Sequence, residues 1–231
     1  MAMTLNVQAD VVNIDSDTPQ PSDIFLVDTN VWLWQTYSRY SVPNLESSDF
    51  ARFADLDRQR ARSEAQRVQK KLSKYLPYIK KALNAGATIV YSGLMLSELA
   101  HVIETTEFKI YKNSNNLGSL TLKEYRNTLP REREEVVAEV QSVWSQVEGL
   151  AISADLMVNE KVTQFALARF ETQSLDGYDL FIIEAISQAG TGQVRIITDD
   201  QDYATVSNIQ VFTANGNAIS EARRLNKLLR R

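Results

Sequence analysis

Short apolar runs alternate along this chain with longer stretches in which apolar residues recur every three or four positions. The runs are rich in β-branched and aromatic residues and are bounded by polar or turn-forming residues, a pattern typical of buried strands. Four strands are predicted in this way, at Ile24–Asp28, Ala87–Tyr91, Val194–Thr198 and Ile209–Phe212.

The longer stretches predict helices between these strands. Within residues 49–84, apolar positions follow spacings of four, four, three and four, which indicates an amphipathic helix that is kinked or restarted near Pro77. Further helices are predicted at 94–104, from Pro130 onwards, at 155–172 and at 179–189. Strands that alternate with helices indicate an α/β fold with a mainly parallel sheet.

The domain organisation follows from the same pattern. Residues 1–22 are polar and contain two prolines, so we expect a flexible N-terminal arm with room for one short strand. Residues 23–231 are expected to form a single domain, with helical insertions at about 49–84 and 106–148.

The residue types present exclude several kinds of site. The chain has no cysteine, which rules out disulfides, thiol catalysis and cysteine-based metal sites, and its single histidine, His101, cannot form a histidine-rich metal site. No apolar run approaches the ~20 residues of a membrane span, and the N-terminus lacks the pattern of a secretory signal. We therefore expect a cytoplasmic protein with no membrane partner, in which carboxylates carry any catalysis.

Charge is distributed unevenly around a net value of −4. The segment 50–84 holds ten basic and three acidic residues, about +7, and the last ten residues add five basic residues and no acid. A local basic face on an acidic body can bind phosphates. A solvated helix face is the alternative reading of either segment. Six side chains of the first segment are candidate nucleic-acid contacts: Arg60, Arg62, Arg67, Lys70, Lys71 and Lys74.

Carboxylates occur at or just beyond the predicted strands. Asp28 ends the first strand, Glu98 lies seven residues beyond the second, and Asp200 follows the third within TDDQDY. Asp179 opens the helix predicted at 179–189. Taken singly, each acid is typical of a turn or a helix N-cap. Because active sites of parallel sheets gather beyond the carboxyl ends of the strands, however, the four together favour a shared site.

Carboxylates that converge would repel one another unless a cation lay among them. Mg²⁺ and Mn²⁺ prefer oxygen ligands, whereas zinc usually recruits histidine or cysteine. Such an ion binds phosphate oxygens and activates water for attack on phosphorus. The acids therefore predict a Mg²⁺ or Mn²⁺ site for phosphodiester hydrolysis.

The segments that carry these acids resemble the motifs of a known family. IFLVDTN, LMLSELAHVIE, YDLFIIEAISQAG and TDDQDY look like the four motifs of PIN-domain ribonucleases, in the same order. That family includes the toxin half of VapC-type toxin–antitoxin pairs and enzymes of RNA processing. The resemblance implies a three-layer α/β/α sandwich with a Mg²⁺- or Mn²⁺-dependent nuclease site. It covers about residues 24–34, 87–104 and 175–213.

Carried over by position, Asp28, Glu98 and Asp179 correspond to the first three acids of the family, and Asp200 corresponds to the fourth. Asp202 matches a further metal-binding acid that often precedes an aromatic residue.

Three further polar residues lie near these acids in the sequence. Asp176 is an alternative third acid, although the apolar helix begins directly after Asp179. The polar pair that follows the first acid appears as Thr29 and Asn30, one of which is expected to position a metal-bound water or a neighbouring carboxylate.

The predicted function is therefore a Mg²⁺- or Mn²⁺-dependent endoribonuclease, with the toxin of a toxin–antitoxin pair as one form of it. The alternatives are a DNA or flap-type nuclease and a catalytically silent PIN-like scaffold that binds RNA or protein. RNA is the expected substrate, and an antitoxin protein and a second copy of the chain are the candidate protein partners.

Overall fold

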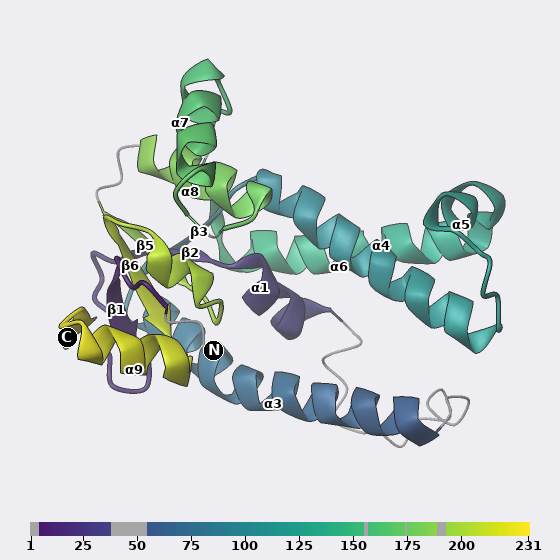
Figure 1. Cartoon of the computed structure of the whole chain (residues 1–231), viewed down its shortest axis with the longest axis horizontal. Coiled ribbons are helices and arrows are strands. Elements are labelled where there is room, and N and C mark those ends of the chain that lie inside the picture. The colour runs from purple at the N-terminus through teal and green to yellow at the C-terminus, as the bar shows by residue number, and fades with distance from the viewer. Residues whose placement is uncertain (1–4, 38–54, 155–156, 174, 189–192) are drawn as a thin grey trace.

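Figure 1 shows the protein as a computed structural model that describes residues 5–37, 55–154, 157–173, 175–188 and 193–231; for residues 55–65, 67, 185 and 188 it describes the backbone alone. The described part contains a seven-stranded sheet in the order β4-β3-β2-β5-β6-β1-β7, in which all neighbouring strands are parallel. Its strands are β1 Asp10–Asn13, β2 Ile24–Val27, β3 Thr88–Tyr91, β4 Ile152–Ser153, β5 Val194–Ile197, β6 Ile209–Thr213 and β7 Leu228–Leu229.

Helices connect and cover these strands. They are α1 Thr29–Thr36, α3 Asp55–Asn84, α4 Leu94–Ser114, α5 Leu122–Thr128, α6 Pro130–Leu150, α7 Glu160–Phe170, α8 Gly177–Gln188 and α9 Gly216–Arg224, with a short 3₁₀ helix, η2, at Asp202–Thr205. None of the helices in the described ranges is long and apolar enough to cross a membrane.

The sheet lies between two helical layers. On one face, Tyr78 of α3 packs against Phe25 of β2 and Phe212 of β6, with ring centroids 6.1 and 6.4 Å apart. On the other face, Ile186 of α8 lines a cavity together with Leu26 of β2. This arrangement confirms the predicted three-layer α/β/α sandwich.

Most elements match the sequence pattern. Each of the four predicted strands is present, α6 begins at Pro130 as expected, and α3 continues through Pro77 as one helix rather than restarting there. The helix predicted at 94–104 extends to Ser114, and the one predicted from 155 begins only at Glu160.

The predicted N-terminal arm contains, at residues 10–13, the one short strand for which the prediction left room. These residues form β1, which pairs with both β6 and β7, and its Val11 and Val12 are almost completely buried. Two apolar residues in a polar segment give little sequence signal, so the pairing of β1 depends on neighbours more than 190 residues away in the chain.

The helical stretches project from the sheet as two arms. In Figure 1, α3 forms one arm, and α4 and α6 lie side by side in the other, with α5 at its far end. Within the second arm, the buried carboxylate of Glu104 on α4 forms ion pairs with Arg126 of α5 and Arg133 of α6. This buried acid joins the three helices.

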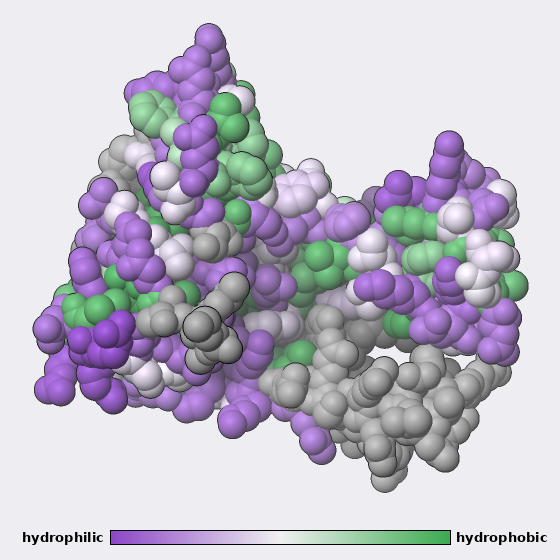
Figure 2. All heavy atoms as spheres, viewed as in Figure 1, coloured by the Kyte–Doolittle hydropathy of each residue, from purple (hydrophilic) through white to green (hydrophobic). Residues whose placement is uncertain are grey.

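Apolar side chains are exposed on α7 and its flanking segments, which form the projection at the top of Figures 1 and 2. Phe165, Leu167 and Phe170 are 49%, 63% and 61% exposed. Exposed apolar surface of this kind is a usual feature of protein-binding faces.

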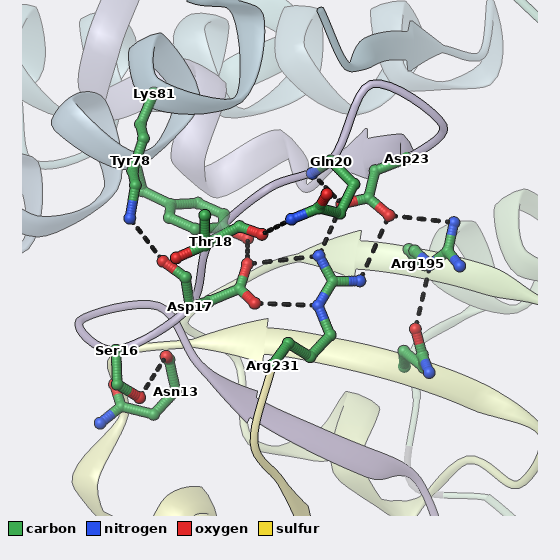
Figure 3. A network of polar contacts seen from close by, with 11 residues as sticks. Asn13, Ser16, Asp17, Thr18, Gln20, Asp23, Tyr78, Lys81, Arg195 and Arg231 are labelled. Carbon is green, nitrogen blue, oxygen red and sulfur yellow. Dashed lines mark hydrogen bonds and ion pairs between the residues drawn. The ribbon is translucent and has the colours of Figure 1, made fainter. Parts of the chain in front are cut away.

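A buried ionic network fixes Arg231 against the sheet (Figure 3). Its guanidinium donates to Asp17 (Nε to Oδ1, 2.9 Å) and to both carboxylate oxygens of Asp23 (2.5 and 3.2 Å). Burial alone would raise the pKa of Asp23, but the hydrogen bonds from Arg231 hold this pKa below its ordinary value. Arg231 is therefore engaged with buried acids instead of forming part of a phosphate-binding face.

We expect Arg231→Ala to lower the free energy of unfolding by about 3 kcal/mol, because the substitution leaves two buried carboxylates without their cation. Urea denaturation at pH 7 measures this change.

The matched control is Arg224→Ala, which removes an arginine from an exposed ion pair with Glu221 on α9. Exposed pairs contribute little, so this variant should unfold close to the wild type. Equal destabilisation by the two substitutions would contradict the assigned role of the network.

Candidate functional site

Three neighbouring strands bring the predicted acids to one edge of the sheet. β3, β2 and β5 are adjacent and parallel, so their carboxyl ends share that edge. Asp28 directly follows β2, Glu98 lies in the second turn of α4 beyond β3, and Asp200 follows β5 by three residues. Asp179 lies in the first turn of α8.

Asp28 is buried, with 3% of its surface exposed, and it has two structural contacts. Its carboxylate accepts a hydrogen bond from the Thr198 hydroxyl (2.7 Å) and, as the N-cap of α1, a longer one from the Asn30 backbone N–H (3.4 Å). Capping explains why a turn residue stands at this position. It does not explain why the charge is buried beside other acids.

Two further carboxylates are each held by one hydroxyl. Thr29 donates to Glu98 (Oγ1 to Oε2, 2.6 Å), and the Tyr203 hydroxyl donates to Asp179. The contact of Thr29 is with a neighbouring carboxylate, which is one of the two roles expected for the polar pair after Asp28. The side chain of Asn30 is exposed, and its predicted role remains a prediction.

The turn after β5 is ordered by its own polar groups. The Asp200 N–H donates to Thr198 Oγ1 (2.9 Å), and the Asp202 N–H donates to Asp200 Oδ1 (2.8 Å). Asp202 then begins η2. Thr198 therefore links this turn to Asp28 through a single side chain.

The buried acids raise one another's pKa. Burial is the largest cause for Asp28 and Glu98, whose pKa values rise to about 7, and for Asp179, whose pKa rises to about 8. Asp28 is further affected by the negative charges of Glu98 and Asp200, and Asp179 by those of Asp28 and Asp200. Asp28 and Asp179 thus lie within electrostatic reach of each other and of Asp200, and Glu98 lies within reach of Asp28 and Asp179.

The donor chemistry fits a hard divalent cation, but the carboxylates are not gathered around one point. Among the described residues, none of the four acids forms an ion pair with lysine or arginine, so no basic side chain of that part of the chain neutralises them. Within the same residues, no group of three or more acids or histidines is placed to hold an ion. Hydroxyl groups of Thr29, Thr198 and Tyr203 contact three of the carboxylates instead.

Asp176, the alternative third acid, has a capping contact. Its Oδ1 accepts hydrogen bonds from the N–H groups of Tyr178 (3.0 Å) and Asp179 (3.2 Å), and its side chain is exposed. Asp179 is 7% exposed, and although the charges of both Asp176 and Asp179 raise the pKa of Glu98, only Asp179 is buried. The geometry therefore favours Asp179 as the site residue.

The predicted phosphate contacts on α3 differ in what they touch. Lys71 forms an ion pair with Asp199 (2.7 Å), and Lys74 forms one with Asp15 (2.7 Å) in which the side chains are 43% and 48% exposed. Lys70 is exposed. The side chains of Arg60, Arg62 and Arg67 lie outside the described part of the structure.

Sequence reasoning missed three side chains that contact the site. Thr198 and Tyr203 hold acids directly, and Tyr75 of α3 contacts the backbone of Thr198. Thr198 and Tyr203 lie within three residues of Asp200, so that proximity was a usable signal. Nothing in the local sequence indicates that Tyr75 reaches the end of β5.

No protein-family model, curated protein or solved structure was found to match this chain. The resemblance to PIN-domain ribonucleases therefore rests on the sequence motifs.

The raised pKa values predict a pH dependence of stability for the protein in EDTA. A carboxyl whose pKa is about 7 or 8 when folded and about 4 when unfolded binds its proton more tightly in the folded state. Its contribution to stability is complete below pH 4 and is lost as pH rises through 7 to 8. We expect Asp28→Asn to remove one such contribution, so that stability falls less steeply with pH, by up to about 1.4 kcal/mol per pH unit.

Urea denaturation between pH 5 and 8.5 measures this slope for the wild type and for Asp28→Asn. Asp10→Asn is the control, because Asp10 begins β1 and so lies at the opposite edge of the parallel sheet. Parallel stability curves for the wild type and Asp28→Asn would show that the Asp28 charge is not destabilised in the folded protein.

Proposed function

We propose that the protein is a Mg²⁺- or Mn²⁺-dependent endoribonuclease. The observation that carries the proposal is the burial of Asp28 and Asp179, with the partly buried Glu98, at one edge of the sheet. Asp28 and Asp179 lie within electrostatic reach of Asp200, and none of these acids has a basic partner in the described part of the chain. Keeping such charges together is costly, and a divalent cation removes the cost. Structural capping accounts for single acids, and it does not account for the group.

In this proposal Asp28, Glu98, Asp179 and Asp200 hold the metal, and Asp202 stands beside them at the start of η2. A bound Mg²⁺ or Mn²⁺ supplies an activated water and neutralises charge on the phosphate. The chain's hydroxyl groups fix the direction of the carboxylates: Thr29 orients Glu98, Thr198 orients Asp28, and Tyr203 orients Asp179.

Basic residues of α3 other than Lys71, which is paired with Asp199, are proposed to hold the RNA backbone. Lys70 is exposed, and Lys74 is engaged only in an exposed pair, which contributes little to stability and leaves its ammonium available to exchange Asp15 for a phosphate. Arg60, Arg62 and Arg67 extend the same helix towards its N-terminus. These contacts would bind RNA without reading its sequence.

A protein partner is a separate proposal. An antitoxin or a second copy of the chain would be sought at the exposed apolar side chains of α7, since surfaces of this kind are usual in protein contacts.

Asp28→Asn should lower Mg²⁺-dependent cleavage of single-stranded RNA by at least about 100-fold, because it removes a charged ligand that no neighbour replaces. Cleavage of an end-labelled RNA at pH 7.5, with and without EDTA, is the measurement. Circular dichroism confirms that the variant is folded.

Asp10→Asn again serves as the matched control and should cleave at the wild-type rate. Equal RNA cleavage by the wild type and Asp28→Asn would exclude the proposed site. Faster cleavage of a DNA flap than of RNA would favour the DNA nuclease. A protein that binds RNA but shows no Mn²⁺ binding by calorimetry would be a scaffold.

A further inference from the structure

The hydroxyl of Tyr75 connects α3 to the ends of two strands. Tyr75 is 1% exposed, and its oxygen lies 3.1 Å from the carbonyl of Thr198 and 2.9 Å from Oδ1 of Asp199 at the end of β5. At the end of β6 it lies 3.0 Å from the hydroxyl of Thr213, and it accepts a hydrogen bond from the Ala214 N–H (2.9 Å). One phenol therefore contacts four polar groups of two adjacent strand ends.

Thr198, whose carbonyl contacts Tyr75, also holds Asp28 and Asp200 through its side chain. The Thr198 side chain donates to Asp28 and accepts from the Asp200 N–H, while its carbonyl faces Tyr75. A movement of Thr198 would therefore displace both acids. Tyr75 touches neither acid, so any influence that it has on them acts through Thr198.

Lys71 lies one turn before Tyr75 on α3 and adds contacts to the same region. Its ammonium pairs with Asp199 (2.7 Å) and lies 4.5 Å from the ring centroid of Trp34. Trp34 belongs to α1, the helix that Asp28 caps. Lys71 thus bridges the turn after β5 and the helix after β2, which are the elements that carry Asp200 and Asp28.

We propose that Tyr75 and Lys71 are positioning residues that hold the Thr198–Asp202 turn in place relative to Asp28. This assigns the middle of α3 to the geometry of the acid site and removes Lys71 from the RNA-binding face. The proposal concerns the protein's own geometry, and only its metal and cleavage consequences rest on the proposed function.

Tyr78 provides a matched control on the same helix. It is also buried, and its hydroxyl donates to Asp17 (2.5 Å), in the ionic network of Figure 3 and not at the acid edge. Tyr75→Phe and Tyr78→Phe each delete one buried hydroxyl. A merely structural role would make the two variants behave alike.

The first readout is hydrogen exchange of the metal-free protein, measured for the amides of Asp200 and Asp202. Tyr75→Phe should speed their exchange about tenfold, the effect expected when one buried hydrogen bond that closes the turn is lost. Tyr78→Phe should change it by less than about twofold. Equal exchange in the two variants would overturn the proposal.

The second readout is Mn²⁺ binding by calorimetry, followed by cleavage kinetics. Tyr75→Phe should weaken Mn²⁺ about tenfold and lower kcat with an unchanged KM, and Lys71→Met should do the same to a smaller extent. A higher KM for RNA with unchanged kcat in Lys71→Met would return Lys71 to the RNA-binding face and overturn its positioning role.

Lys71→Met also keeps the proposal testable if Tyr75→Phe does not fold, because its side chain is 39% exposed. If the wild type neither binds Mn²⁺ nor cleaves RNA, the proposed function fails, while hydrogen exchange still decides whether Tyr75 and Lys71 order the turn.

Discussion

Parallel pairing of β3, β2 and β5 is the constraint on which the other features of the site depend. Because neighbouring strands run in the same direction, the segments that follow them must begin at one edge of the sheet. Asp28 and Asp200 lie in the segments that directly follow β2 and β5 at that edge. Glu98 lies in the second turn of α4, which follows β3 at the same edge. An antiparallel β2–β5 pair would place Asp28 and Asp200 at opposite edges, and neither the shared electrostatics nor the bridge through Thr198 would exist.

The energetic consequence is a group of acids that destabilises the fold when all of them are charged. Burial and like charge raise the pKa values of Asp28, Glu98 and Asp179 to between about 7 and about 8. Near neutral pH these carboxyl groups are therefore partly protonated, which reduces the repulsion among them. The network around Arg231 shows the contrasting arrangement, in which Asp17 and Asp23 are just as buried but have an arginine between them. The fold thus pairs one acidic group with an arginine, whereas no basic side chain of the described residues pairs with the other.

Sequence patterns predicted the fold and the candidate acids. They did not predict contacts between segments that are distant in the chain. Strands such as Val194–Ile197 were predictable because uninterrupted apolar runs signal burial, whereas β4 and β7 are two-residue strands with no such signal, and β1 is defined by its neighbours. The placement of the four acids followed from chain order and parallel topology. The contact of Tyr75 with Thr198 joins residues 123 positions apart, and no local spacing specifies it.

The acids at this edge are proposed to share one cation. The most direct measurement is the anomalous scattering of a crystal of the wild-type protein soaked in Mn²⁺. A single strong anomalous peak is expected within about 2.5 Å of carboxylate oxygens from Asp28 and at least two of Glu98, Asp179 and Asp200. A crystal with no peak at this edge, in which the carboxylates keep only their contacts with Thr29, Thr198 and Tyr203, would contradict this proposal.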